Sequence, residues 1–402
     1  MATIVEKIKD IEKEMARTQI NKATMSHLCT LRAKLAKLRT QLLEPPKGSA
    51  GPGEGFEVER VGDARVALIG FPSVGKSTIL STFTSTKSEC AAYEFTTLTC
   101  IPGIIYHKDT RIQLLDLPGI IEGASEGKGR GRQVIAVARS ADLILLVVDA
   151  GSGKAERQRE LLVRELEVVG LRLNQKPPNV FFKRKKTGGI TISSSCQLQN
   201  ISERDVQQLL HEYRINSAEV LFREDCTIDQ FIDIIEGNRK YVRCLYVYNK
   251  IDMTTIEECD RIMQMPNTMV LSCQMKLNLD VFLDKIWEYL GLVRVYTKPR
   301  GKKPDFGDPL VLTDGRYGTT VEAACKQIHR TLLQSFDYAI VWGLSVKHTP
   351  QRCGLAHSLY DEDVIQVVKK RNQKELDPHN QKKGPVEKSR NQIKKAKPNL
   401  KS

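Results

Sequence analysis

Residues 70–77 read Gly-Phe-Pro-Ser-Val-Gly-Lys-Ser, which fits the phosphate-loop pattern GxxxxGK followed by Ser or Thr. The apolar run at 66–69, directly before this segment, indicates a buried strand. Gly70 and Gly75 lack the Cβ that would keep phosphates away from the backbone N–H groups of a curled loop. The segment therefore predicts a nucleoside triphosphate site built on a strand, a loop and a helix.

The residues of this loop predict how the nucleotide and its metal are bound. Lys76 supplies a positive charge for the β and γ phosphates, and the Ser77 hydroxyl can ligate Mg²⁺. Thr78 opens a helix whose positive end faces the anion. We expect the loop's nucleotide contacts to come from Gly70, Pro72, Ser73, Val74, Gly75, Lys76, Ser77 and Thr78.

Further segments follow in the order that a guanine-nucleotide switch requires. Asp116-Leu117-Pro118-Gly119 ends an apolar strand at 112–115. We expect Asp116 to hold Mg²⁺ through a water and the Gly119 N–H to contact the γ-phosphate. Thr96-Thr97, within residues 92–98, can close over Mg²⁺ and the γ-phosphate only while the triphosphate is intact, which makes this pair the predicted switch.

The base is predicted from two later segments. Asn249-Lys250-Ile251-Asp252 follows the strand at 244–248, at the end of the sheet where doubly wound folds bind ligands. The Asp252 carboxylate can accept hydrogen bonds from two guanine donors that adenine lacks, so the segment selects guanine. Ser272-Cys273-Gln274, after the strand at 269–271, is expected to lend backbone N–H groups to the guanine carbonyl.

With these segments in place, the chain resembles the developmentally regulated GTP-binding proteins, a branch of the Obg superclass, and most nearly their type 2 paralogue. The resemblance covers roughly residues 4–370. It implies that Thr97 ligates Mg²⁺. It also implies association with translating ribosomes and with a dedicated regulatory partner protein. The segments that carry it lie at 92–98, 116–124, 127–133, 211–213, 220–226 and 338–343.

The resemblance also implies the architecture, an α/β fold with a P-loop GTPase domain at residues 63–290. A helical hairpin at 1–47 precedes this domain, and an α/β subdomain resembling a ribosomal protein is inserted at about 172–238. A TGS domain of the β-grasp fold follows at 291–370. Residues 371–402 lie outside the resemblance, and their composition predicts a disordered basic tail.

The spacing of apolar residues predicts how the helices of the amino-terminal hairpin begin, end and pack. In the hairpin, Thr3 with Glu6 fits a capping box and Pro45-Pro46 stops the second helix. The second helix carries basic side chains that are either a solvated face or a contact for RNA or a partner. The helices are expected to pack through two seams, Ile4, Ile8, Ile11 and Met15 on the first and Leu28, Leu31, Leu35, Leu38 and Leu42 on the second.

In the insertion, Thr187-Gly188-Gly189 indicates a β-hairpin between strands at 180–182 and 190–192. The four cations at 183–186 suit rRNA phosphates, and an exposed basic turn without a partner remains the alternative. Two helices are expected to follow, one from Ser202 and one from Thr227, the latter with Gln230 in a capping box.

From Val293 onward the pattern changes to strand, turn and strand, followed by a helix from Thr320 to about Phe336 and strands at 339–342 and 364–368. Thr319 with Glu322 is expected to cap this helix. Its buried face is expected to contain Val321, Ala324, Ile328 and Leu332, while His348 and His357 are interpreted as loop residues.

Composition limits the class of protein. The chain has 402 residues, 41% of them hydrophobic, and the longest apolar stretch of the central strand, at 143–148, is too short to span a bilayer. There is no secretory hydrophobic region at the start and no prenylation cysteine at the end. The ten cysteines include no CxxC pair. We expect a cytoplasmic protein without membrane insertion or DNA binding.

The net charge of +14 is concentrated at the end of the chain. Residues 371–402 contain ten Lys or Arg against three Asp or Glu, a net +7. This tail is either merely solvated or an arm that neutralises RNA phosphates, and it could equally contain a nuclear targeting signal that sends a fraction of the protein to the nucleus.

Together these features predict a GTPase switch that docks on ribosomes and rRNA, with Lys76, Thr97 and Gly119 assisting phosphoryl transfer. Turnover by the isolated protein should be slow, because Ile120 stands where many switches carry a water-orienting glutamine. Potassium is a candidate activator, although Ser73 stands where potassium-dependent relatives often carry asparagine. The alternatives are an RNA or ribosome scaffold that holds GTP with little turnover, or a microtubule or trafficking adaptor.

Overall fold

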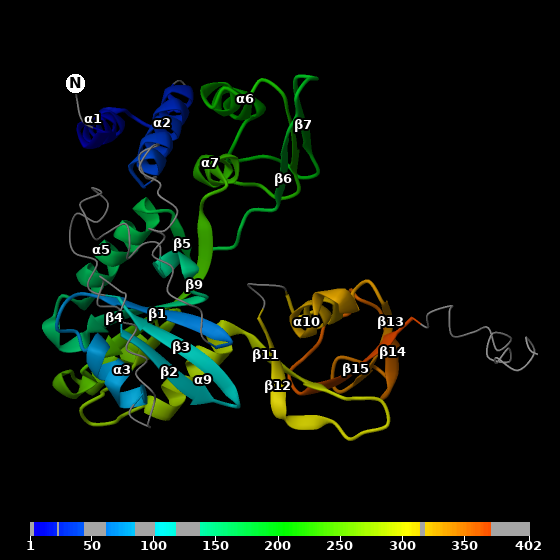
Figure 1. The fold of residues 1–402 in the computed structure, drawn as a ribbon. Helices are drawn as coiled ribbons and strands as arrows, with labels where there is room; N and C mark the ends of the chain where they lie inside the picture. Colours follow the sequence, from blue (N-terminus) through cyan, green and yellow to red (C-terminus); the bar gives the residue numbers. More distant parts are fainter. Residues whose placement is uncertain are drawn as a thin grey trace, which may run out of the picture. The chain divides into compact units, whose positions relative to one another are not determined.

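The computed structural model describes residues 4–21, 24–43, 62–84, 101–117, 137–313 and 318–370. The chain divides into two compact units, Met1–Leu292 and Val293–Ser402 (Figure 1). Among the described residues, no helix combines the length and the apolar character needed to cross a bilayer.

The main sheet of the first unit has the order β10-β9-β4-β1-β3-β2, with β5 beside β9. All of its neighbouring strands pair in parallel, except that β2 runs antiparallel to β3. β1 and nearly all of β4 are buried, which explains their almost continuous apolar sequences. The strands are β1 (Ala64–Gly70), β2 (Ile101–His107), β3 (Thr110–Asp116), β4 (Leu143–Asp149), β5 (Leu171–Leu173), β9 (Lys240–Asn249) and β10 (Thr268–Val270).

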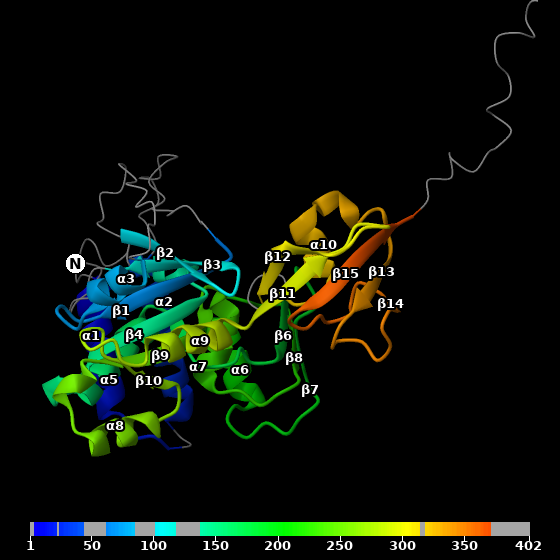
Figure 2. The same ribbon diagram turned by 90° about the horizontal axis from the view of Figure 1, so that it is seen from below.

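Helices cover both faces of this sheet, as expected for a doubly wound fold (Figure 2). Leu162 of α5 (Ala155–Val168) and Ile262 of α8 (Ile256–Met263) belong to one core cluster with Ile69. α3 (Lys76–Thr84) and α9 (Leu279–Leu290) pack together through the rings of Phe83 and Phe282, whose centroids are 5.3 Å apart.

The insertion contains a separate sheet, in which the predicted hairpin is wrong. β6 (Val180–Arg184) and β7 (Ile190–Ser194) do not pair with each other, because β8 (Ala218–Phe222) lies between them. β8 runs antiparallel to β6 and parallel to β7. Its residues Ala218, Val220 and Phe222 are fully buried, so the central position covers the most apolar strand of the three.

The two helices of the insertion begin where the sequence predicts. Ser202 caps α6 (Glu203–Glu212), and Thr227 with Gln230 forms the predicted capping box of α7 (Ile228–Glu236). Both helices pack against the inner side of the insertion's sheet, where they share a core cluster with β8.

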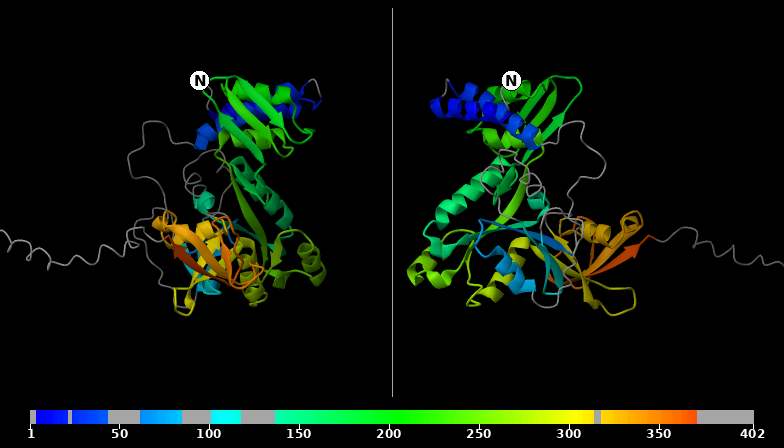
Figure 3. Two further views of the ribbon diagram at one scale, coloured as in Figure 1. Left: turned by 90° about the vertical axis from the view of Figure 1, so that its right-hand side faces the viewer. Right: turned by 60° about the vertical axis from the view of Figure 1, so that its left-hand side comes forward.

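The amino-terminal hairpin consists of α1 (Ile4–Arg17) and α2 (Met25–Leu43). The predicted seams describe it only in part, since no residue of α1 is buried and Ile4 is 37% exposed. On α2 only Leu28 and Leu31 of the five predicted leucines are buried. α2 lies beside α6 and α7 of the insertion (Figure 3). A different stripe of small residues is buried there, namely Cys29, Ala33 and Ala36. Small side chains allow this close approach between helices.

The second unit is a mixed sheet with the order β12-β11-β15-β13-β14. α10 (Val321–Ile328) covers one face, where Val321 and Ala324 are fully buried beside Val341. The strands are β11 (Leu292–Thr297), β12 (Asp305–Thr313), β13 (Phe336–Trp342), β14 (Gln351–Cys353) and β15 (Asp363–Lys369), and a short helix η4 (Arg330–Leu332) follows α10.

Three predictions about α10 are wrong. The helix ends at Ile328 and not near Phe336, because His329 is extended (φ −168°, ψ 132°) and its side chain accepts from the Thr331 N–H. Its N-cap is Thr320 and not Thr319. Ile328 is 41% exposed, and the buried positions beside Val321 and Ala324 are Ala323 and Cys325. His348 and His357 lie in loops, as predicted.

Candidate functional site

The candidate site lies where the parallel strands of the main sheet end. Asp116 at the end of β3 is level with Leu68 of β1. Asp149 at the end of β4 is level with Asn249 at the end of β9. The loops that follow these strands therefore meet at one edge of the sheet, which is where open α/β sheets bind ligands.

Tight contacts require glycine at two positions, one at the end of β1 and one in the loop that follows it. Gly75 has a φ of +95°, and a Cβ there would lie 2.3 Å from Asn249 Nδ2. A Cβ on Gly70 would lie 2.4 Å from the Val147 carbonyl oxygen of β4. Ser73 also has a positive φ, +65°. The loop is thus curled against β4 and β9, and not only shaped to admit phosphates.

Lys76 is the first residue of α3 and is 8% exposed. Its Nζ donates to the carbonyl oxygens of Gly70 (2.8 Å) and Phe71 (2.7 Å). Burial lowers the pKa of Lys76 below its ordinary value, and the charge of Asp116 partly opposes that effect. These contacts place the ammonium group inside the curve of the loop.

Ser77 and Asp116 contact each other directly across the two strand ends. The Ser77 Oγ donates to Asp116 Oδ2 at 2.7 Å. The other carboxylate oxygen, Oδ1, is buried and has no hydrogen-bond partner among the described residues. A hydroxyl beside a carboxylate with one unsatisfied oxygen is an oxygen donor set of the kind that Mg²⁺ prefers.

Asn249 connects the loop after β1 with the loop after β10. This side chain is 2% exposed, and its Nδ2 donates to the Val74 carbonyl at 3.0 Å. Its Oδ1 accepts from the backbone N–H groups of Lys250 (2.8 Å) and Cys273 (3.4 Å). One amide therefore joins three of the predicted segments.

Asp149 is a further member of the site that no motif in the sequence marks. Its Oδ2 is 2.7 Å from Lys250 Nζ, and its Oδ1 accepts from Gly151 N at 3.0 Å. Lys250 has a φ of +64°. In the sequence, Asp149 could be recognised only by its position, because it is the acidic residue at the end of the central strand, and that strand pairs with the strand of Asn249.

Asp252 and Ser272 lie together at the other end of the site. The Ser272 Oγ donates to Asp252 Oδ1 at 2.6 Å and accepts from Met275 N at 3.2 Å. Ser272 is fully buried and Cys273 is 8% exposed. Burial raises the pKa of the Cys273 thiol to about 11. Cys273 therefore stays a neutral thiol at neutral pH.

Comparison with known proteins places this site in a family. A profile described as "50S ribosome-binding GTPase" matches residues 65–184. Residues 187–292 match one described as "C-terminal region of MMR_HSR1 domain", and residues 293–369 match the TGS domain. The Homo sapiens protein "Developmentally-regulated GTP-binding protein 2" is 62% identical over 367 residues, 91% of this chain and 100% of the human one.

The chain belongs to the developmentally regulated GTP-binding proteins. "Developmentally-regulated G-protein 2" of Arabidopsis thaliana is 63% identical over 368 residues, 92% of each chain. The Dictyostelium discoideum homologue of the type 2 protein is 61% identical over 91% of this chain and 100% of that one. The predicted family is thus confirmed, and with it a GTP-binding GTP hydrolase that combines a P-loop domain with a TGS domain.

The structure brings most of the predicted site residues of this GTPase together. The loop after β1, Asp116, the Asn249 to Asp252 segment and the Ser272-Cys273 pair all lie at the same sheet edge. Thr96, Thr97, Gly119 and Ile120 lie outside the described residues, as do the Thr3 cap, Pro45-Pro46 and the tail at 371–402.

Proposed function

We propose that this GTPase is a molecular switch that acts on ribosomes during translation, with its affinity for the ribosome set by the γ-phosphate. The observation that carries the GTP-dependent part is the convergence of Lys76, Asp116 and Asn249 at one sheet edge. The ribosomal part is supported by the description of the matching profile and by exposed cations of the insertion at 183–186.

The roles of the loop residues follow from its geometry. Lys76 contributes the charge for the β and γ phosphates, and the backbone N–H groups of Ser73 to Thr78 bind the phosphate oxygens at the start of α3. Phosphoryl transfer then depends mainly on positioning and charge neutralisation. Gly119 and Thr97 complete this arrangement when GTP is bound.

The arrangement of Ser77 and Asp116 fits Mg²⁺. Ser77 Oγ would ligate the ion directly and Asp116 would act through a water, which uses the buried Oδ1 that has no partner among the described residues. Thr97 would supply a further oxygen. When bound, Mg²⁺ neutralises charge on the β and γ phosphates.

Guanine is selected by the segment that begins at Asn249. The Asp252 carboxylate accepts from two donors of the base, and Ser272 orients that carboxylate through its 2.6 Å hydrogen bond. Backbone N–H groups at 272–273 donate to the guanine carbonyl. Asn249 fixes the positions of these two loops relative to the phosphate loop through its side-chain hydrogen bonds.

Hydrolysis by the isolated protein is slow in this proposal, because Ile120 cannot orient the attacking water. Stimulation comes from the ribosome, a dedicated regulatory partner protein or a potassium ion beside the phosphates. Lys128, Arg130 and Arg132 are candidate sources of additional charge. The cytoplasm is the expected site of action, with a nuclear fraction if the basic tail contains a targeting signal.

Ribosome co-sedimentation and single-turnover hydrolysis test the proposal together. Purified protein should sediment with ribosomes more strongly with a non-hydrolysable GTP analogue than with GDP. Hydrolysis should be slow in sodium and faster with ribosomes. Equal sedimentation with both nucleotides would favour the scaffold alternative, and binding to microtubules but not ribosomes would favour the adaptor. Fast hydrolysis in sodium alone would refute slow intrinsic turnover.

A further inference from the structure

The second unit contains a strongly basic hollow of about 1020 Å³ that lies outside the nucleotide site. Among the described residues that line it, Asp337 is the one carboxylate. The cations come from the connection between β11 and β12 and from the end of β15, and they are Lys298, Arg300, Lys302, Lys303, Lys369 and Lys370. A ligand of this hollow must carry several negative charges.

The floor of the hollow is the face of the sheet opposite α10. Along β13, Ala339 and Val341 are buried in the core with α10, whereas Tyr338 and Ile340 are half-buried and line the hollow. Tyr338 is level with Val368 of β15, which also lines it. This alternation places an aromatic and aliphatic surface between the cations.

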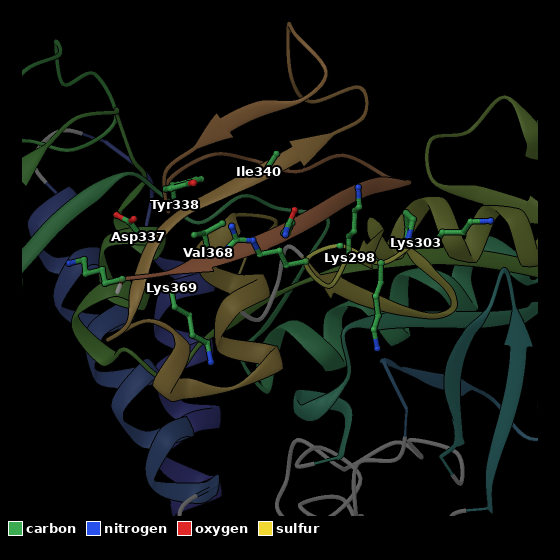
Figure 4. Close-up of a pocket in the computed structure, with 13 residues that line it drawn as sticks. Lys298, Lys303, Asp337, Tyr338, Ile340, Val368 and Lys369 are labelled. Carbon is green, nitrogen blue, oxygen red and sulfur yellow. The ribbon is translucent and has the colours of Figure 1, made fainter. Parts of the chain in front are cut away.

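The labelled side chains in Figure 4 are spread along the direction of β13 and β15. Lys298 and Lys303 stand near one end, Asp337 and Lys369 near the other, and Tyr338, Ile340 and Val368 lie between them. The charges are thus distributed along an elongated surface instead of around one point, which suits a chain of phosphates better than a single anion.

Two cations on this face are already stacked on aromatic rings. Lys298 Nζ lies 4.4 Å from the ring centroid of Trp342, and the Arg352 guanidinium carbon lies 4.6 Å from that of Tyr338. Trp342 follows Tyr338 and Ile340 on the same face of β13, where it is level with Val364. Aromatic rings and guanidinium planes beside phosphate-binding cations are the elements on which unpaired bases stack.

We propose that the open face of β13 and β15 binds single-stranded RNA, with bases over Ile340, Val368 and the stacked pair of Arg352 and Tyr338, and phosphates beside the surrounding lysines and Arg300. This inference extends the proposed ribosomal function by assigning it an RNA-binding surface. An acidic peptide would satisfy the charges but would leave the aromatic floor unexplained. A duplex would present no free bases to it.

Fluorescence anisotropy on the full-length protein tests the proposal with a labelled, unstructured RNA of about 12 nucleotides. The triple variant Arg300→Ala, Lys302→Ala, Lys303→Ala should bind at least tenfold more weakly. The slope of log affinity against log salt should decrease by about 2, since each lost phosphate contact removes about 0.7. Tyr338→Leu should weaken binding about tenfold and leave the slope unchanged.

The matched control is Lys326→Ala with Arg330→Ala, which removes exposed cations from α10 and η4. This variant should bind RNA almost as the wild type does. The proposal is overturned if the triple variant and the control bind the RNA equally, or if duplex RNA or polyglutamate competes as well as the single strand. All variants should retain GTP binding, which confirms that the first unit is folded.

Sedimentation with ribosomes separates this inference from the proposed function. If wild-type protein binds the RNA through the hollow but does not bind ribosomes with either nucleotide, the proposed function fails and the RNA surface stands. If it binds ribosomes according to nucleotide state while the triple variant binds RNA normally, the proposed function stands and the RNA surface fails.

Discussion

The side-chain amide of Asn249 donates a 3.0 Å hydrogen bond to the carbonyl oxygen of Val74, in the middle of the phosphate loop. The same side chain accepts from the backbone N–H of Cys273, in the loop that is expected to contact the base. The two ends of the nucleotide site are therefore connected through one buried amide, and a disturbance at either end should reach the other.

Asn249→Ala should weaken binding of GTP and GDP alike, by about tenfold or more, because it leaves the Val74 carbonyl without its donor. The unfolding free energy should decrease by about 1–3 kcal/mol. The matched control is Asn174→Ala, since Asn174 also bonds backbone groups, both on Cys244, but away from the site. Titration with fluorescent nucleotides should show lost affinity only in the first variant. Equal affinities would contradict the bridging role.

Gly75→Ala should abolish nucleotide binding, because the new Cβ would lie 2.3 Å from Asn249 Nδ2. Gly153→Ala is the control, since Gly153 also has a positive φ (+62°) but nothing lies within 4 Å of its added Cβ. Both substitutions cost about 1–2 kcal/mol of backbone strain. Only Gly75→Ala should affect nucleotide affinity, and a similar loss in both would attribute the effect to strain alone.

Asp252→Asn should reduce GTP affinity by about two orders of magnitude or more and shift preference toward xanthosine triphosphate, whose altered ring edge suits an amide. Ser272 can still donate to the new side chain, so the loop should keep its structure. Competition between GTP and xanthosine triphosphate measures the shift. Asp260→Asn, on the exposed side of α8, should change neither affinity. Unaltered GTP binding by Asp252→Asn would refute the assignment.

Ser77→Ala should remove the Mg²⁺ dependence of GTP binding, because the hydroxyl is the predicted ligand beside Asp116. In wild-type protein, chelation of Mg²⁺ should accelerate release of GTP, whereas the variant should release it quickly with or without the ion. Stopped-flow release of labelled GTP measures both rates. Ser81→Ala, an exposed position of α3, should retain the wild-type response.

Asp233→Ala should destabilise the first unit by about 3–5 kcal/mol, because it removes the carboxylate that Arg172 and the more deeply buried Arg239 share. Asp233 is 5% exposed and accepts from Arg172 Nε (2.7 Å) and Nη2 (2.9 Å). Burial alone would lower the pKa of Arg172, but the bonded Asp233 outweighs it and the pKa lies above its ordinary value. Denaturant unfolding measures the loss. Glu219→Ala, which breaks an exposed pair with Lys185, should have little effect.

Elements whose determinants are local in sequence could be predicted well. The strands that end at Gly70 and Asn249 are apolar runs bounded by motif residues, and the Thr227 capping box depends only on residues three apart. The segments that bind guanine and phosphate could also be recognised, because each is a short contiguous motif and the motifs follow one another in the order that the fold requires. Asp149 contributes through its position beside Asn249, which no local pattern reveals.

The wrong predictions concern choices made by distant residues. The turn at 187–189 favours a hairpin, but pairing of β6 and β7 would have left β8, with Val220 and Phe222, without its central place. The end of α10 is a local exception, since the sequence keeps its helical periodicity beyond Ile328 and the extended conformation of His329 ends the helix. The burial of Cys29, Ala33 and Ala36 on α2 could not be predicted, because these small residues form no apolar pattern and their partners on α6 and α7 are distant in the sequence.

The central position of β8 also sets an order of events during synthesis. β6 and β7 leave the ribosome before β8 exists, and neither can complete its ladder until Phe222 has been made. The stripe of Cys29, Ala33 and Ala36 on α2 can be fully buried only later still, because its partner helix α7 ends at Glu236. The first helices and the insertion must therefore complete their shared core late, after more than half of the chain has emerged.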